Sequence, residues 1–306
     1  MYGPYDLLPT QDAVTCALPD GMLPRYKVLP GCKPCVARLD SLGFTTGLAI
    51  TIAGVSIGLQ TNDATLLGRL PDYFPPGWRS CMSHEVDQLY SIFVPREPAG
   101  QRLRRYSLLY RDVSRLARTI GFGTDNFEVM EASMVRTVSR TSKDFLFVRG
   151  GVVGWEGQAI MVVGPPGSGR TTFIKELVGA GAQYYSDQFA VFDREGLVHP
   201  FPTPIYSSNG TDACRRICPT QYHGSTPLRL GRVLVTHYEP GARWRPRPLT
   251  QGQAMLAIME WSINADRWPM AVGSLCHAVL RSSAFKGKRG EAASVVPELL
   301  GCGSAA

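Results

Sequence analysis

Apolar residues occur along most of the chain in short runs, each bounded by glycine, proline or polar residues. Runs of this length favour buried β-strands over helices. They are found at residues 48–52, 55–59, 89–94, 106–110, 145–148, 152–153 and 159–163. A further strand region is expected at 184–192 and a final strand at 233–236. The pattern therefore predicts a protein rich in β-sheet.

In four places the apolar spacing changes to that of an α-helix. Between residues 124 and 140, apolar side chains recur three and four positions apart behind the start signal Thr124-Asp125-Asn126. Residues 172–180 show the same spacing, and two more helices are expected at about 250–262 and 267–281. Strands and helices together predict the α/β (α+β) class.

These patterns divide the chain into three parts. Residues 1–45 contain many prolines and little periodicity, which predicts an irregular N-terminal extension. Residues 46–123 predict a small α/β N-terminal lobe, and residues 124–306 predict a larger domain that opens with the helix at 124–140. An irregular stretch from about 199 to 228 is long for a plain connection, so it is interpreted either as a lid or acceptor-docking loop or as disorder.

Composition excludes several protein classes. Charged residues make up 19% of the chain and hydrophobic types 44%, against roughly 25% charged in typical soluble domains, which rules out a disordered protein. The longest apolar run, residues 47–59, is shorter than the roughly 20 residues of a membrane-spanning helix. The first residues lack the basic start and apolar stretch of a secretory signal. We therefore expect no membrane partner and a cytoplasmic location.

The net charge of +7 is modest for 306 residues and favours acidic partners without demanding nucleic acid. The arginine clusters at 102–105 and 243–247 lack the interleaved aromatic platform of single-strand binders, so no specific nucleic-acid partner is expected. The prolines of Arg243-Trp-Arg-Pro-Arg-Pro248 favour an extended, exposed segment. It could hold an acidic peptide, or form an edge strand whose charges discourage aggregation. The oligomeric state stays open between a monomer and a homo-oligomer.

Eight cysteines are too few for a disulfide framework in a chain of this length. Cys32-Lys-Pro-Cys35 has the spacing of half a zinc site, and Cys214, Cys218 and His223 could supply the remainder. No second CxxC completes that pattern. Reduced cysteines in loops are therefore the main interpretation, with a zinc site as the alternative.

One glycine-rich segment carries a chemical signature. It reads Gly164-Pro-Pro-Gly167-Ser168-Gly169-Arg170-Thr171-Thr172. This matches the phosphate-loop pattern GxxxxGK[ST] except that arginine replaces lysine, and it stands between a predicted strand and a predicted helix. Glycines let several backbone N–H groups turn inward to cradle phosphate oxygens at the positive end of the helix. The hydroxyl of Thr171 is placed to bind Mg²⁺.

Arg170 changes the chemistry of this loop. A planar guanidinium replaces a compact ammonium, and at a site shaped around a point charge the exchange is not conservative. A glycine-rich turn that binds nothing is the alternative interpretation.

Beyond the loop, residues 145–204 resemble the HPr kinase family, bacterial serine kinases whose core is similar to the nucleotide-binding domain of PEP carboxykinase. The resemblance is carried by residues 145–155 (FLFVRGGVVGW), 179–188 (GAGAQYYSDQ) and 199–202 (HPFP). The flanks at 46–94 and from 227 onwards look like a branch of HPr kinase-like proteins with their own N-terminal lobe. Some members of that branch phosphorylate a serine of a ribosomally made precursor peptide.

The resemblance implies ATP and Mg²⁺ as cofactors and a small protein or precursor peptide as the phosphate acceptor. Asp187 corresponds to the family's base toward the acceptor hydroxyl, and with Thr171 it would hold the metal. The chain departs from the family pattern at Gln188, where an acid is expected, and at Arg149, where the family has a histidine. Arg149 and Arg170 could both face phosphate oxygens and neutralise charge during transfer.

Three hypotheses follow. The first is an active serine or threonine kinase, and the second is a degenerate pseudokinase that binds a nucleotide for regulation or scaffolding. The third is an α/β fold that binds no ligand.

Overall fold

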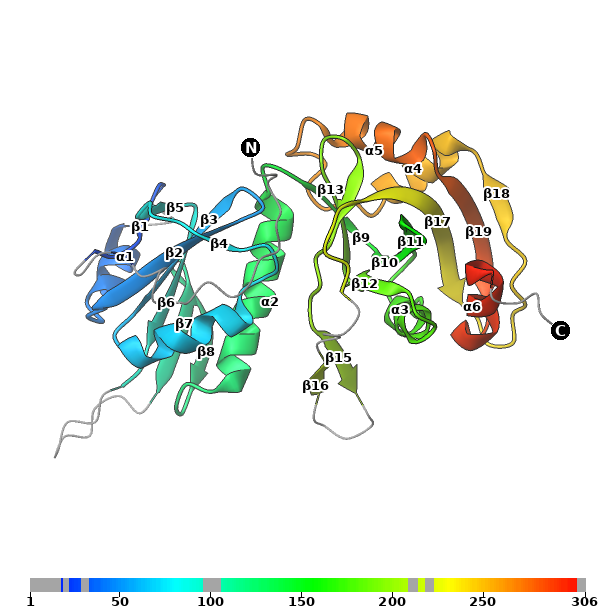
Figure 1. The fold of residues 1–306 in the computed structure, drawn as a ribbon. Coiled ribbons are helices and arrows are strands. Elements are labelled where there is room, and N and C mark those ends of the chain that lie inside the picture. Colours follow the sequence, from blue (N-terminus) through cyan, green and yellow to red (C-terminus); the bar gives the residue numbers. More distant parts are fainter. Residues whose placement is uncertain are drawn as a thin grey trace. The chain divides into compact units, whose positions relative to one another are not determined.

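The structure is a computed structural model that describes residues 18, 22–28, 33–95, 106–208, 214–217 and 223–301 (Figure 1). The chain forms two compact units, of which the first ends at Lys143 and the second begins at Asp144. Both contain sheets and helices, so the predicted mixed α/β class is confirmed. None of the helices in the described part of the chain combines the length and apolar character that crossing a membrane requires.

The N-terminal unit is built on a six-stranded sheet. Its strands are β2 (Thr46–Ile52), β3 (Val55–Thr61), β4 (Arg79–Ser80), β6 (Gln88–Phe93), β7 (Ser107–Arg111) and β8 (Ser114–Thr119). Their order is β4-β2-β3-β6-β7-β8, antiparallel except between β3 and β6. Ala53 and Gly54 close the β2–β3 hairpin with φ of 48° and 76°, as a two-residue hairpin turn requires.

A long helix covers this sheet. The predicted helix at 124–140 is confirmed as α2 (Thr124–Thr141), and its apolar face, including Phe127, Met130 and Met134, is buried. The hydroxyl of Tyr90 in β6 lies 3.0 Å from the hydroxyl of Ser133 on α2. Because this face packs on the N-terminal sheet, the division of the chain falls after α2, one helix later than the position 123/124 expected from the sequence.

The stretch expected to be an irregular extension contains regular structure among its described residues. These elements are β1 (Arg25–Tyr26) and α1 (Lys33–Asp40), and β1 pairs in parallel with β5 (Glu85–Val86).

The C-terminal unit holds a nine-stranded sheet. Its strands are β9 (Leu146–Arg149), β10 (Gly151–Trp155), β11 (Gln158–Val163), β12 (Gln183–Ser186), β13 (Phe189–Phe192), β14 (Leu197–His199), β17 (Leu228–Tyr238), β18 (Arg247–Leu249) and β19 (Ser283–Arg289). Seven follow the order β12-β10-β11-β17-β14-β13-β9, and β19 and β18 extend outward from β17. A separate pair, β15 (Ile205–Ser208) and β16 (Cys214–Ile217), lies within the stretch expected to be irregular.

Strand direction gathers several chain segments at one edge of this sheet. β11, β17 and β19 are mutually parallel, and β12 runs the same way because β10 is antiparallel to both β11 and β12. The carboxyl ends of these four strands therefore meet at the same edge, which is where ligands bind in open α/β sheets.

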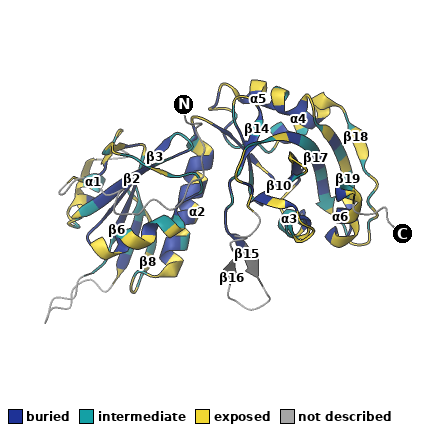
Figure 2. Ribbon diagram, viewed as in Figure 1, coloured by how far each residue is buried: buried dark blue, intermediate teal, exposed yellow. Residues whose placement is uncertain are grey.

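Helices cover both faces of the sheet (Figure 1). α3 (Arg170–Gly179) and α6 (Ala292–Leu300) share one apolar core, whereas α4 (Gln251–Met259) and α5 (Ala271–Val279) share the other. Figure 2 shows the central strands mainly buried and the outer sides of these helices exposed. The predicted strand 184–192 is two strands, β12 and β13, because the chain turns at Asp187 and Gln188.

Candidate active site

The glycine-rich segment leaves the carboxyl end of β11 and enters α3, as the sequence predicts. α3 begins at Arg170, two residues before the predicted start. Gly164 is required where the loop leaves the sheet, since an added Cβ would lie 2.1 Å from the carbonyl oxygen of Thr236 on β17. Gly167 and Gly169 have φ of 78° and 72°, a region that residues with a Cβ rarely adopt. The three glycines thus fix the path of the loop.

A buried arginine supports the loop from β19. Arg289 is 1% exposed, and its Nη2 donates to the carbonyl oxygens of Ser168 at 3.1 Å and of Gly169 at 2.7 Å. Its guanidinium lies 4.6 Å from the ring centroid of Phe173 on α3. These bonds hold two loop carbonyls against β19. Sequence reasoning missed Arg289, because its partners lie 120 and 121 positions earlier in the chain.

Asp187 lies directly beside the loop. The hydroxyl of Thr171 donates to its Oδ2 at 3.0 Å, and the hydroxyl of Tyr184 lies 3.0 Å from its Oδ1. Burial raises the pKa of Asp187, and the hydrogen bonds from Thr171 and Tyr184 and the charge of Lys175 only partly oppose this. The Tyr184 hydroxyl also lies 2.8 Å from the carbonyl oxygen of Thr203, so its one proton faces two acceptors. A buried carboxyl with a raised pKa is suited to accepting a proton.

Arg170 lies near this carboxyl, and Arg149 lies near Arg170. Burial lowers the pKa of Arg170, the charge of Asp187 opposes that shift, and the charge of Arg149 reinforces it. Arg149 ends β9, but the chain continues at once into β10, whose first residue Gly151 pairs with Val162 at the end of β11. The structure thus brings together Arg149, Arg170 and Asp187 from three separate segments. Because the positive charges of Arg149 and Arg170 disfavour each other, an anion bound between them would be stabilised.

Several buried polar atoms around the loop lack a hydrogen-bond partner among the described residues. They are Ser168 Oγ, Arg170 Nη1, Thr236 Oγ1 and Arg289 Nε. Ser168 is 4% and Thr236 3% exposed. Buried polar groups are nearly always paired with protein or water, so their concentration here indicates a place for a polar ligand or ordered water. Thr172, by contrast, is exposed on α3.

The oxygen atoms present fit a magnesium ion in part. Thr171 Oγ1 and Asp187 Oδ2 lie 3.0 Å apart, and Mg²⁺ binds one or two protein oxygens together with phosphate oxygens and water. Gln188, where the family pattern has an acid, is half-buried, and its backbone carbonyl oxygen accepts a hydrogen bond from the N–H of Gly150. Within the described ranges, no three His, Cys, Asp or Glu residues form a metal-binding group. A metal here therefore depends on a bound phosphate to complete its shell.

The alternative zinc site falls partly outside the described residues. Cys32 and Cys218 are not described, and the side chain of Cys214 is not described either. That hypothesis stays a prediction.

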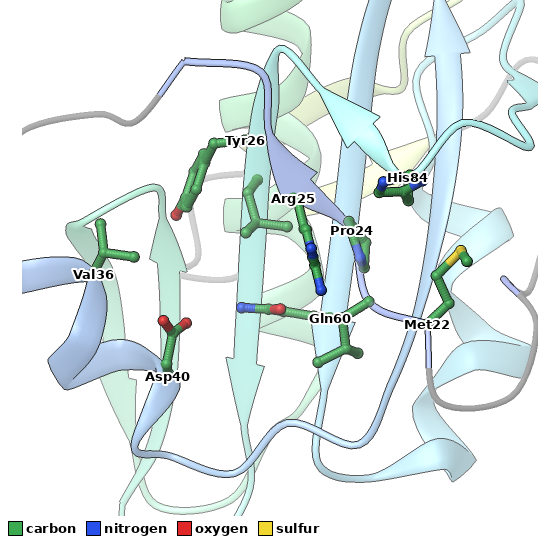
Figure 3. A pocket seen from close by; sticks show the side chains of 10 residues that line it. Met22, Pro24, Arg25, Tyr26, Val36, Asp40, Gln60 and His84 are labelled. Atoms are coloured by element: carbon green, nitrogen blue, oxygen red, sulfur yellow. The ribbon is translucent and has the colours of Figure 1, made fainter. Parts of the chain in front are cut away.

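A cavity of about 750 Å³ lies in the N-terminal unit (Figure 3). Figure 3 shows Tyr26 and Asp40 beside the same space as Arg25 and Gln60. Burial raises the pKa of Tyr26, and the charges of Asp112 and Asp40 add to the shift. None of the ten residues that line the cavity is a serine, threonine or cysteine. Among these lining residues, Tyr26 offers a phenolic hydroxyl, and none offers an aliphatic hydroxyl or a thiol. The cavity belongs to the N-terminal unit, whereas the phosphate loop belongs to the C-terminal unit.

The sequence matches no model of a known protein family and no curated protein.

Proposed function

We propose that this protein is an ATP-dependent kinase that transfers the γ-phosphoryl group to a serine or threonine hydroxyl of a small protein or peptide. The observation that carries the proposal is the 3.0 Å contact between Thr171 at the start of α3 and the buried Asp187. In phosphate-loop enzymes, a hydroxyl at this loop position and an aspartate from a neighbouring strand hold Mg²⁺ against the nucleotide phosphates. The resemblance to HPr kinases supports a P-loop-containing core of their type and an acceptor that carries a hydroxyl.

In this proposal, Asp187 serves both the metal and the acceptor hydroxyl, and the other parts of the site act on the phosphates. Backbone N–H groups of Gly167 and of residues 169–171 bind the β- and γ-phosphates at the positive end of α3. Pro165 and Pro166 have no N–H, and the N–H of Ser168 donates to the carbonyl oxygen of Pro165. Asp187 accepts the proton of the acceptor hydroxyl as the new oxygen–phosphorus bond forms and ADP leaves with the electrons of the broken bond. Arg170 and Arg149 stabilise the charge on the transferring group. A bound Mg²⁺ would supply further charge neutralisation at the phosphates.

The test is label transfer from γ-labelled ATP with Mg²⁺ to serine-containing peptides encoded near this gene. Label should reach the peptide with the wild-type protein and be lost with Asp187→Asn. Asp266→Asn is the matched control, because Asp266 is exposed and lies outside the site. Unchanged transfer by Asp187→Asn would refute the role assigned to Asp187, and the absence of nucleotide binding would refute the proposal as a whole.

The second candidate is a pseudokinase that binds a nucleotide and transfers nothing. It is favoured by the bonding of Asp187, since both of its carboxylate oxygens already have protein partners and Gln188 adds no second acid. Calorimetry would then show nucleotide binding without turnover. Restored transfer in the double variant Arg170→Lys with Gln188→Asp would show that the scaffold remains competent for catalysis.

A further inference from the structure

Basic side chains cover one face of the sheet at the edge that carries the phosphate loop. We call Arg245, Arg247, Lys286, Lys288 and His237 the basic face. All but His237 are exposed, and the His237 side chain is 45% exposed. Figure 2 shows exposed positions along β18 and the segment that leads into it.

Strand register places these side chains next to one another. Arg247 pairs with Lys286, and His237 pairs with Lys288 one row further along. Side chains two positions apart in a strand point to the same face, so Lys286 and Lys288 lie together. Trp244 points the other way and packs against the core beneath α3 and α6. The basic face therefore lies on the sheet face opposite α3.

Three of the basic side chains on this face have no acid partner among the described residues. Glu239 forms an ion pair with Lys288 at 2.6 Å and lies 3.9 Å from His237. Arg245, Arg247 and Lys286 form no ion pair within the described part of the chain. Like charges directly opposite each other in a sheet are destabilising, and Arg247 faces Lys286 in this way. Among the described residues, no acid pairs with Arg247 or Lys286 to offset this repulsion.

Protection of the sheet edge does not account for this pattern. Charges that prevent edge-to-edge pairing are needed only on the outermost strand. Here they extend inward from β18 to β19 and β17. Pro246 and Pro248 already remove two N–H donors at the edge. The inner charges are thus in excess of what edge protection requires.

The basic face begins beside the phosphate loop. His237 and Lys288 immediately precede Tyr238 and Arg289, and an added Cβ on Gly169 would lie 2.6 Å from Arg289 and 3.5 Å from Tyr238. A chain bound along the basic face would therefore reach the edge of the sheet where Asp187 and the loop lie.

We propose that the basic face binds an acidic peptide segment, which, if the proposed kinase function holds, belongs to the acceptor. A peptide fits better than single-stranded nucleic acid because the one aromatic residue of the segment 243–249, Trp244, is turned into the core and offers no stacking surface. The prolines limit backbone pairing at the outer edge, so recognition falls to the arginine and lysine side chains, which bind carboxylates well.

Fluorescence anisotropy on the full-length protein tests this without nucleotide. The probes are a labelled 15-residue peptide rich in Asp and Glu, the same peptide with Asn and Gln, and a single-stranded oligonucleotide. We expect the acidic peptide to bind in a salt-dependent manner and the neutral peptide to bind at least about tenfold more weakly. The double variant Arg245→Glu with Arg247→Glu should weaken binding of the acidic peptide by about tenfold or more.

The matched control is Arg194→Glu with Arg281→Glu, which changes the net charge equally at two exposed positions outside the basic face. It should bind the acidic peptide about as tightly as wild type. Equal loss in both double variants, no loss in either, or preference for the oligonucleotide would overturn the proposal. ATP affinity, measured separately on each variant, should not change. If wild type binds the acidic peptide but not ATP, the proposed function fails while the basic face stands as a peptide-binding surface.

Discussion

At the residue scale, the site buries a carboxyl group in surroundings that disfavour its charged form. Asp187 is 7% exposed, and burial raises its pKa, although Arg170 lies near it. A carboxylate held in such surroundings is destabilised in its charged form, which makes it a better proton acceptor than an exposed aspartate. The same feature predicts a conflict between stability and activity at this position.

Asp187→Asn should stabilise the protein at neutral pH while abolishing transfer. The folded-state pKa of Asp187 is raised, so its contribution to stability is greatest below its ordinary pKa near 3.8 and is lost as pH rises through the folded value. Asparagine carries no charge, can accept from Thr171, and can donate to the Tyr184 hydroxyl, which leaves that proton for Thr203. We expect a gain of about 1 kcal/mol, the net worth of one hydrogen bond.

Thermal unfolding from pH 3 to pH 8 provides the measurement. The melting temperature of Asp187→Asn should exceed that of wild type at pH 7, and the two curves should converge below about pH 4. If Asp187→Asn is less stable than wild type at pH 7, the charged carboxylate is well solvated, or its hydrogen bonds and neighbouring charges fully offset the cost of burying it.

Arg289→Met tests the support of the loop. The substitution keeps much of the side chain's apolar volume but removes the donors to Ser168 and Gly169, so we expect nucleotide affinity to fall by about tenfold along with a loss of about 1–3 kcal/mol in stability. Calorimetry with ATP and denaturant unfolding measure the two effects.

The control for this prediction is Arg232→Met, which removes a bond to the Leu299 carbonyl oxygen away from the loop. It should lower stability without changing nucleotide affinity. If Arg289→Met also leaves nucleotide affinity unchanged, Arg289 serves the fold alone.

At the element scale, the turn from β11 into α3 depends on two different properties of glycine. Gly164 is needed because an added Cβ would collide with β17. At Gly167 there is room for a Cβ, since no atom lies within 4 Å, so glycine is needed there only for the positive φ. The sequence motif requires glycine at both positions for no stated reason, and only the position of β17 in the structure shows that the two reasons differ.

Gly164→Ala should therefore destabilise the protein more than Gly167→Ala. The first change forces β11 and β17 apart and should cost about 3 kcal/mol, near the upper end for overpacking. The second places alanine at a left-handed backbone position and should cost about 1–2 kcal/mol. Urea unfolding of the two variants compares the costs, and equal values would mean that the contact with Thr236 relaxes freely.

Most helices and strands with a regular spacing of apolar residues were predictable from the sequence. The buried strands β2, β3, β6 and β11 and the helix α2 follow their apolar patterns closely. β8 and β19 were not predicted, because their exposed arginines and lysines hide the alternation expected of a strand. The break between β12 and β13 was also missed, since apolar residues lie on both sides of Asp187.

At the scale of the whole molecule, the two units have separate apolar cores. One core cluster joins Leu18, Ala49, Val86 and Leu89, and two others draw only on residues from Leu146 onwards. The phosphate loop and the residues that contact it, Asp187 and Arg289, all belong to the C-terminal unit. The stabilising effect of a ligand bound at the loop should be confined to that unit, as expected for domains that open as independent cooperative units.

Hydrogen exchange with and without ATP and Mg²⁺ tests this expectation. Amides of the segments 164–173 and 184–190 should become more protected by about tenfold or more when nucleotide is bound. Amides of β2, β3 and β6 should exchange at unchanged rates. Protection spreading into these N-terminal strands would show that the two units are energetically coupled.

The sequence by itself determined the phosphate loop, its strand–helix context and the main buried strands, because these depend on residues close together in the chain. Only the tertiary structure placed Asp187 against Thr171, Arg149 near Arg170 and Arg289 beneath the loop. These contacts depend on strand order and direction, which bring together residues far apart in the sequence. The packing of α2 on the N-terminal sheet likewise decided where the first unit ends. The apolar face of α2 predicts that the helix packs on a sheet, but the sequence does not tell which of the two sheets that is.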